Sequence, residues 1–272
     1  MGDSFKVACV QTNSVRDVAP NIEAVGALVR RAHADGAELI MLPESVNMLE
    51  PRGRNMREKM ALEEDDAFLE AFRSLAAELG AWILIGSLML KISDDQAANR
   101  SILIDDRGNV AARYDKMHMF DVDVGDGQSY RESRLYRPGD KIVVADTPWG
   151  KLGLTVCYDL RFPYLYRALA QAGAEFITVP AAFTRVTGQA HWHVLLRARA
   201  IENGCFIFAP AQTGDHAEGR QTFGHSLVVD PWGTVLADGG EAVGIVTAEI
   251  DPGLVAKARG KIPSLTHDRK IS

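Results

Sequence analysis

Residues 152–163 read LGLTVCYDLRFP, a short apolar run that ends at Cys157 and is followed by charged residues and Pro163. The apolar run predicts a buried strand, and Pro163 favours the first turn of a helix. Cys157 is therefore expected at a strand-to-helix turn, where a thiol is exposed and backbone N–H groups can face an oxyanion. The alternative is a small side chain buried in the core, since free cysteines are among the most buried residues.

Composition narrows the class of protein and of partner. The chain has 272 residues, a net charge of −6 and 47% hydrophobic residues, which predicts a soluble globular α/β protein. This acidic balance argues against nucleic-acid binding, and no apolar stretch is long enough to cross a membrane. Three widely spaced cysteines indicate neither disulfides nor a metal site. We expect a cytoplasmic protein with a small-molecule partner and no bound metal.

A second strand end carries a carboxylate. Apolar residues at helical spacing between 22 and 32 lie between two predicted strands, at 5–12 and 38–42, which is a β-α-β pattern. The second of these strands ends at Pro43-Glu44. Glu44 is therefore a candidate general base, and the alternative is a solvated glutamate in a loop.

A third strand end carries a lysine. Residues 99–104 and 110–114 flank a turn and predict a β-hairpin, which favours mixed sheets. Lys116 follows this hairpin directly. The polar segment 121–140 predicts a long loop in which residues 130–133 (YRES) fold back over a cleft. Residues 51–60 also predict a loop, and Arg197 and Arg199 are expected on the solvent or subunit face of a helix at 188–203.

A thiol, a carboxylate and an ammonium group suit amide hydrolysis because each serves a different step. The Cys157 thiol must lose its proton to attack a carbonyl carbon. Glu44 can accept that proton, pass it to the leaving amine and later activate water. Lys116 and the backbone N–H of Tyr158 can stabilise the tetrahedral oxyanion, with roughly 3 kcal/mol from each good donor.

Three segments resemble the signature regions of the nitrilase superfamily of carbon–nitrogen hydrolases, and they occur in that family's order. They are residues 42–44 (LPE), 114–120 (YDKMHMF) and 156–163 (VCYDLRFP). Similarity continues at residues 190–192 (AHW), 195–203 (LLRARAIEN) and 224–226 (GHS). The resemblance implies one domain over residues 1–272, folded as a four-layer αββα sandwich with two mixed β-sheets.

The same resemblance implies the chemistry and the assembly. It implies catalysis by Glu44, Lys116 and Cys157 without a metal or an organic cofactor, with Glu132 as a second glutamate beside Lys116. It also implies a homodimer or a higher homo-oligomer, and the polar tail from about residue 263 is expected to pack on the partner subunit. Within the superfamily the chain is most similar to the branch that contains deaminated glutathione amidase and ω-amidase. His193 stands where members often have glutamate, which leaves the fine substrate specificity open.

The expected substrate is a small amide that carries a carboxylate and a 2-oxoglutaryl group. Arg161, Arg185 and Tyr158 are the candidate substrate-binding residues, since a guanidinium can bind a carboxylate through two parallel hydrogen bonds. The alternative for Arg161 is a structural ion pair with Asp159. Deaminated glutathione is expected ahead of 2-oxoglutaramate. A nitrilase or another acyl hydrolase is the enzymatic alternative, and a catalytically silent binding or scaffold protein is the non-enzymatic one.

Overall fold

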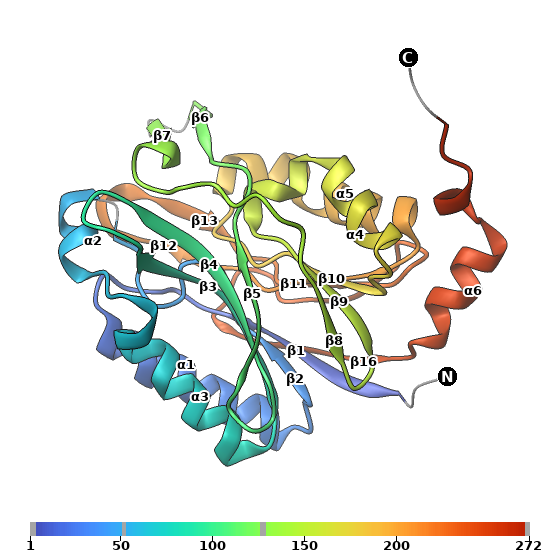
Figure 1. The fold of residues 1–272 in the computed structure, drawn as a ribbon, viewed down its shortest axis with the longest axis horizontal. Helices are drawn as coiled ribbons and strands as arrows, with labels where there is room; N and C mark the ends of the chain where they lie inside the picture. The colour runs from blue at the N-terminus through green and yellow to red at the C-terminus, as the bar shows by residue number, and fades with distance from the viewer. Residues whose placement is uncertain (1–3, 51–52, 126–128, 270–272) are drawn as a thin grey trace.

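Two six-stranded sheets pack face to face, and helices cover their outer faces (Figure 1). The computed structural model describes residues 4–50, 53–125 and 129–269. The first sheet has the order β16-β1-β2-β3-β4-β5. Its strands are β1 (Phe5–Gln11), β2 (Leu39–Met41), β3 (Trp82–Lys91), β4 (Ala97–Ile104), β5 (Val110–Asp115) and β16 (Gly244–Ile250).

The second sheet has the order β15-β14-β11-β10-β9-β8. Its strands are β8 (Val144–Thr147), β9 (Gly150–Leu154), β10 (Phe176–Thr178), β11 (Phe206–Ala209), β14 (Leu227–Val229) and β15 (Val235–Asp238). Each sheet has a parallel centre, β1-β2-β3 in one and β9-β10-β11 in the other, with antiparallel strands outside it. Both sheets are therefore mixed, as the sequence predicted.

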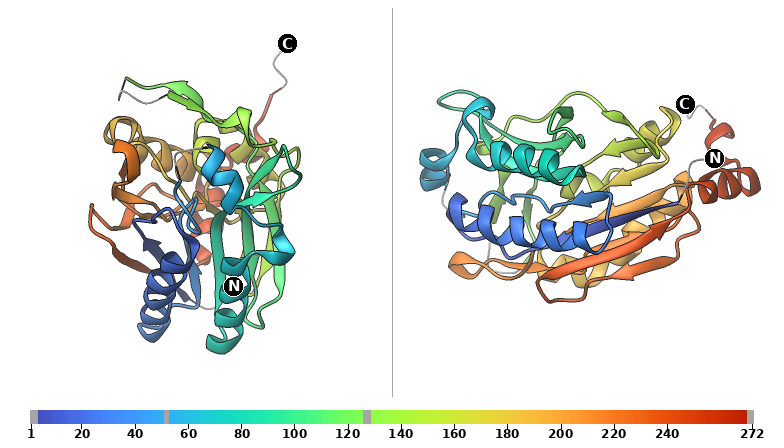
Figure 2. Two further views of the ribbon diagram at one scale, coloured as in Figure 1. Left: turned by 90° about the vertical axis from the view of Figure 1, so that its left-hand side faces the viewer. Right: turned by 90° about the horizontal axis from the view of Figure 1, so that it is seen from below.

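Successive side chains of the strand β1 point alternately into two different hydrophobic cores. In β1, Val7 and Cys9 belong to the core between the sheets, whereas Ala8 and Val10 belong to the core beneath the helices. This is the period of two that a strand buried on both faces requires. The helices α1 (Val18–Ala34) and α3 (Ala67–Leu79) cover the first sheet and run side by side (Figure 2).

The outer face of the second sheet is covered by α4 (Pro163–Gln171) and α5 (Arg185–Asn203). Pro163 occupies the first turn of α4, as the sequence predicted. Backbone N–H groups in the first turn of a helix have no partner within the helix, so a proline, which lacks this group, costs no hydrogen bond there. The buried side chains of Trp192 and Leu196 attach α5 to the sheet. The four layers confirm the predicted αββα sandwich.

Two predictions about local structure are wrong. The segment from residue 53 to residue 59 is a helix, α2 (Gly53–Lys59), where a loop was expected; residues 51 and 52 lie outside the described residues. Arg199 does not face solvent. Its side chain is buried and donates to the carbonyl oxygen of Leu160, so the guanidinium takes up a backbone acceptor at the end of the Cys157 turn.

Smaller elements complete the chain. They are the hairpins β6 (Asp121–Asp123) with β7 (Ser129–Arg131) and β12 (Thr213–Asp215) with β13 (Gln221–Phe223), and the helix α6 (Gly253–Lys261). In Figure 2, α6 lies at the end of the molecule where the amino terminus is found. The tail after α6 contacts its own chain, since Arg167 of α4 pairs with Asp268. Among the described residues, no helix combines the length and apolar character needed to cross a membrane.

Candidate active site

The ends of three strands meet between the two sheets. Glu44 follows β2 and Lys116 follows β5, both in the first sheet, while Cys157 follows β9 in the second. The strands β2 and β5 run in the same direction because two antiparallel pairings separate β3 from β5. Their carboxyl ends therefore lie at one edge, where the three side chains come together.

Glu44 is fixed by three hydrogen bonds. Its Oε1 accepts from the Asn99 side-chain amide at 2.9 Å and from Lys116 Nζ at 3.0 Å, and its Oε2 accepts from the backbone N–H of Ala182 at 2.8 Å. Burial raises the pKa of Glu44, but the charge of Lys116 and these hydrogen bonds outweigh it and lower the pKa below its ordinary value. The carboxylate is therefore ionised at neutral pH.

Lys116 is held between two carboxylates. Its Nζ lies 3.0 Å from Glu44 Oε1 and 2.8 Å from Glu132 Oε2, and the side chain is 1% exposed. Burial lowers the pKa of Lys116, but Glu132 and Glu44 raise it well above its ordinary value. Glu132 is itself fixed by the backbone N–H of Phe120 at 2.9 Å. The ammonium therefore remains charged and cannot turn away.

Cys157 lies at a strained turn. Its φ is +48°, a backbone conformation that residues other than glycine rarely adopt. Its backbone N–H donates to the carbonyl oxygen of Pro180 at 2.9 Å. Burial and the nearby Glu44 carboxylate raise the pKa of the thiol, and Lys116 lowers it only in part. The nearby thiol in turn helps to lower the pKa of Glu44. The resting pair is thus a neutral thiol beside an ionised carboxylate, which is ready to take its proton.

Asp159 connects the segment that carries Lys116 with the turn that carries Cys157. This buried carboxylate accepts from the hydroxyl of Tyr114 at 2.7 Å, from the backbone N–H of His118 at 3.1 Å and from the backbone N–H of Val156 at 2.9 Å. The predicted alternative, an ion pair of Asp159 with Arg161, is wrong because donors from the first sheet occupy both carboxylate oxygens.

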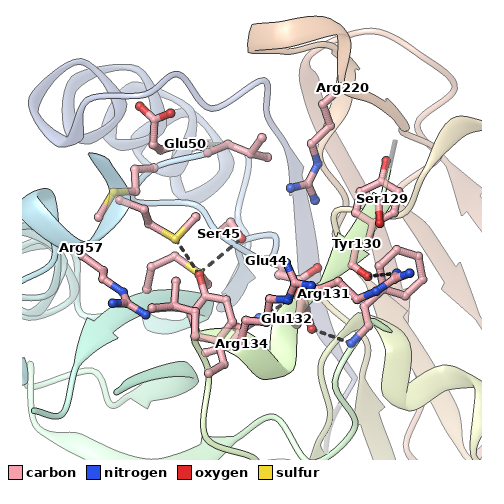
Figure 3. A pocket seen from close by; sticks show the side chains of 18 of the residues that line it. Glu44, Ser45, Glu50, Arg57, Ser129, Tyr130, Arg131, Glu132, Arg134 and Arg220 are labelled. Carbon is pink, nitrogen blue, oxygen red and sulfur yellow. Dashed lines mark hydrogen bonds between the residues drawn. The ribbon is translucent and has the colours of Figure 1, made fainter. Parts of the chain in front are cut away.

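A cleft of about 720 Å³ opens above this group (Figure 3). A recess of about 10 Å³, room for one water-sized group, lies beside Cys157. Four residues line both cavities: Glu44, Phe120, Glu132 and Arg220. Sequence reasoning missed Arg220, which precedes β13 in a polar segment. It also missed Asn99, although an amide among the apolar residues of β4 was an available signal.

The three candidate substrate-binding residues lie in different places. Tyr158 lines the recess. The guanidinium of Arg161 lies 5.2 Å from the ring centre of Phe183 and 5.9 Å from that of Tyr158, and both rings line the recess. Arg185 is in the first turn of α5 and lies 3.5 Å from Asp215, away from the recess.

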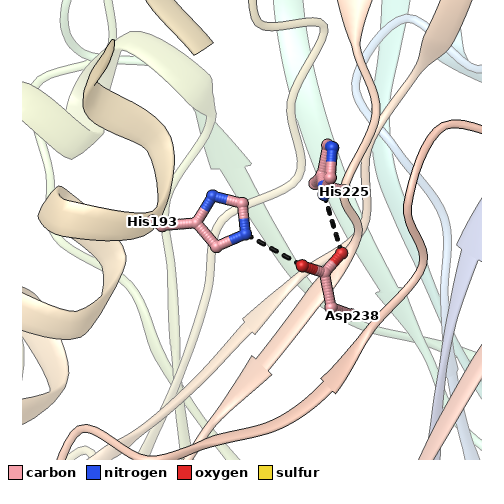
Figure 4. A group of neighbouring side chains, drawn as sticks. All are labelled: His193, His225 and Asp238. Atoms are coloured by element: carbon pink, nitrogen blue, oxygen red, sulfur yellow. Dashed lines mark hydrogen bonds and ion pairs between the residues drawn. The ribbon is translucent and has the colours of Figure 1, made fainter. Parts of the chain in front are cut away.

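His193 belongs to a separate group of side chains (Figure 4). Its Nε2 lies 2.9 Å from Asp238 Oδ2, and His225 Nδ1 lies 2.9 Å from Asp238 Oδ1. Within the described ranges, these three residues are the group with ligand atoms close enough to share a metal ion. Asp238 bridges the two imidazoles, so His193 connects α5 to β15.

Known proteins match this chain over nearly its full length. A family model described as carbon-nitrogen hydrolase matches residues 6–260. The deaminated glutathione amidase of Yersinia enterocolitica is 42% identical over 269 residues, which cover 98% of this chain and 93% of that protein.

Two solved structures share the fold. The Caenorhabditis elegans NitFhit protein has a TM-score of 0.92 and 37% identity, covering 98% of this chain and 66% of that chain. Saccharomyces cerevisiae Nit3, described as a member of branch 10 of the nitrilase superfamily, has a TM-score of 0.86 and 30% identity, covering 96% and 94%. The chain belongs to the carbon–nitrogen hydrolase family, which confirms the resemblance to the nitrilase superfamily.

Proposed function

We propose that this protein is an amidase that hydrolyses a small carboxylate-bearing amide through a thioester on Cys157. The observation that carries the proposal is the neutral Cys157 thiol beside the ionised Glu44 carboxylate, with the Lys116 ammonium 3.0 Å from that carboxylate. Deaminated glutathione is the first candidate substrate, since the similar protein of Yersinia enterocolitica bears that name. The candidate role of Tyr158 is to donate its backbone N–H to the oxyanion.

The proposed reaction has two half-reactions. Glu44 takes the thiol proton while Cys157 Sγ attacks the amide carbon, and Lys116 with the Tyr158 N–H stabilises the oxyanion. The C–N bond breaks as Glu44 returns the proton to the leaving amine. Water then attacks the thioester, Glu44 accepts its proton, and the C–S bond breaks to regenerate the thiol and release a carboxylic acid. Glu132 acts as a positioning residue because it fixes the Lys116 ammonium.

Arg161 is the better candidate for the carboxylate of the acyl half. Its guanidinium lies over Phe183 and Tyr158, which line the recess beside Cys157. Arg185 is a weaker candidate because Asp215 already lies 3.5 Å from it. A substrate that binds through Arg161 places its carbonyl near the thiol, which suits a 2-oxoglutaryl group.

Intact-protein mass spectrometry tests the mechanism. Brief mixing with deaminated glutathione and acid quenching is expected to add the mass of a 2-oxoglutaryl group to the wild type and none to Cys157→Ala. Release of 2-oxoglutarate from deaminated glutathione and from 2-oxoglutaramate is then compared with the release of ammonia from a neutral aliphatic amide and from a nitrile. Equal turnover of the neutral amide contradicts the substrate class, turnover of the nitrile alone indicates a nitrilase, and no adduct or turnover indicates a binding protein.

The proposed assembly is a homodimer. Val194 and Ile201 are 67% and 52% exposed, lie seven residues apart on one face of α5, and have the 56% exposed Trp232 nearby in the turn before β15. Such a patch is typical of a protein interface. Sedimentation of the wild type is expected to give a dimer, and Ile201→Asp a monomer. A monomeric wild type contradicts this assembly.

The proposed compartment is the cytoplasm. Cys9, Cys157 and Cys205 are all free thiols in the structure, and thiols persist in reducing compartments. Fractionation of the source cells, with antibody detection, tests this location.

A further inference from the structure

The large cleft is far bigger than the release of ammonia requires. The recess beside Cys157 has room for one water-sized group, whereas the cleft that joins it has a volume of about 720 Å³. Glu44, the group that must protonate the leaving nitrogen in the proposed reaction, lines both cavities. The cleft therefore has room, next to Glu44, for a leaving amine much larger than ammonia.

Arginines line the cleft together with four glutamates, Glu44, Glu50, Glu58 and Glu132. Arg57, Arg134 and Arg220 line it, and none of them makes a side-chain hydrogen bond or ion pair with any residue in the ranges 4–50, 53–125 and 129–269. A fourth arginine of the cleft, Arg131, is already paired with protein oxygen atoms. Arg131 donates to the carbonyl oxygen of Val122 at 3.0 Å and lies 3.2 Å from Asp123. The carboxylates of Glu44 and Glu132 at the floor are already paired with Lys116.

Arg220 is the arginine nearest the reacting groups. It lines both the recess and the cleft, and Figure 3 shows its side chain reaching toward Glu44 and Glu132. Its Nε is buried and has no hydrogen-bond partner among the described residues. The guanidinium lies 5.9 Å from the ring centre of Tyr130, which holds it over the cleft. A buried donor without an acceptor is costly, so an oxygen supplied by a ligand would satisfy it.

We propose that the cleft binds the leaving amine of the substrate and that Arg220 receives a carboxylate carried by that amine. This inference rests on the proposed amidase reaction and adds to it the residue that recognises the leaving amine. A guanidinium offers several N–H donors in one plane, which match the two oxygens of a carboxylate. Arg220 therefore distinguishes an amide of a peptide from an amide of ammonia.

Kinetics with three substrates test this role. They are deaminated glutathione, its analogue with a carboxamide in place of the terminal carboxylate, and 2-oxoglutaramate, which releases ammonia. Arg220→Gln is expected to lower kcat/KM for deaminated glutathione roughly 10- to 100-fold, the effect of losing a charge-assisted hydrogen bond. The other two substrates are expected to change less than about threefold, and Arg220→Lys to recover part of the loss.

Arg131→Gln is the matched control. It removes a guanidinium from the same cleft, but one that is already paired with oxygen atoms of the protein. It is expected to affect the three substrates equally. An equal loss for all three in Arg220→Gln would overturn the proposal, because it would indicate either a structural role or a contact with the 2-oxoglutaryl half that the three substrates share.

A binding measurement separates this inference from the reaction itself. In the Cys157→Ala background, calorimetry is expected to show that cysteinylglycine binds more tightly than its C-terminal amide, and that Arg220→Gln abolishes the difference. Equal binding of the two ligands overturns the role of Arg220 even if the wild type hydrolyses deaminated glutathione. Failure of the wild type to turn over any amide contradicts the proposed function, while the calorimetry still decides the role of Arg220.

Discussion

Asp159 Oδ1 lies 2.6 Å from His118 Nδ1, across the boundary between the two sheets. His118 belongs to the segment after β5 that carries Lys116, and Asp159 belongs to the turn that carries Cys157. The same carboxylate accepts from Tyr114 of β5. One buried side chain therefore fixes the position of the lysine segment relative to the cysteine turn.

We expect Asp159→Asn to destabilise the protein by about 2–4 kcal/mol, because an amide nitrogen would face donors that need an acceptor. Activity is expected to fall as the Cys157 turn shifts from Lys116. Urea denaturation and kcat/KM measure the two effects. Tyr114→Phe, which removes one of the hydrogen bonds to Asp159, is the control and is expected to cost about 1 kcal/mol. Wild-type stability of Asp159→Asn would contradict this role.

The three cysteines are expected to behave differently on substitution. Cys157→Ala should lower turnover by at least about 10³-fold with little change in folding, since the proposal makes its thiol the nucleophile. Cys9 and Cys205 are buried, burial raises the pKa of each to about 12, and each thiol donates to a backbone carbonyl oxygen rather than to a carboxylate that could take its proton. Cys9→Ala and Cys205→Ala should keep the chemical step, as single-turnover assays can show. Loss of chemistry in folded Cys205→Ala protein would reassign the nucleophile.

Glu44 and Lys116 are expected to affect different steps. Glu44→Gln should slow both acylation and deacylation by about 10²- to 10⁴-fold, because proton transfer occurs in each. Lys116→Met should mainly slow acylation, by about 10²- to 10³-fold, because it removes oxyanion stabilisation. Rapid-quench measurement of the acyl-enzyme separates the steps. Acylation of Lys116→Met at the wild-type rate would exclude the oxyanion role.

The pH profile should be set by Glu44 on the acid side. Burial raises the pKa of Glu44, but Lys116 and the hydrogen bonds lower it overall, so its charge and its contribution to stability are lost only below about pH 4.3. For Lys116, burial lowers the pKa while Glu132 and Glu44 raise it, so its contribution is lost only above about pH 10.4. We expect a flat kcat/KM between these limits, with folding followed by circular dichroism. An acid limb centred between about pH 6 and 7 would be inconsistent with an ionised Glu44 at rest.

Gly86 is expected to be essential for packing the site. A Cβ there would lie 1.9 Å from the carbonyl oxygen of Leu42 and 2.5 Å from Cβ of Pro180, in the segments that lead to Glu44 and Ala182. Gly86→Ala should therefore cost at least about 2 kcal/mol and lower kcat. Gly26→Ala, in α1 with no atom within 4 Å of the new Cβ, is the control and should stabilise by about 0.5–1 kcal/mol. Thermal unfolding measures both, and equal melting temperatures would contradict the prediction.

By itself, the sequence determined the positions of Glu44, Lys116 and Cys157 at strand ends. An apolar run that stops at a polar residue is a local signal, and the strand bounds confirm it at all three places. The resemblance added the two-sheet sandwich and placed Glu132 beside Lys116, and the structure has that contact at 2.8 Å. The α2 helix was missed because its short polar segment has no apolar period.

Only the tertiary structure decided which side chains face one another between the sheets. Asp159 accepts from residues more than 40 positions earlier in the chain, and Arg220 reaches a cleft whose other walls come from β4, β7 and α2. Hydrogen bonds and free guanidiniums of this kind depend on distances between distant segments. Those distances follow from how two sheets and their connecting loops pack, which no local pattern of residues encodes.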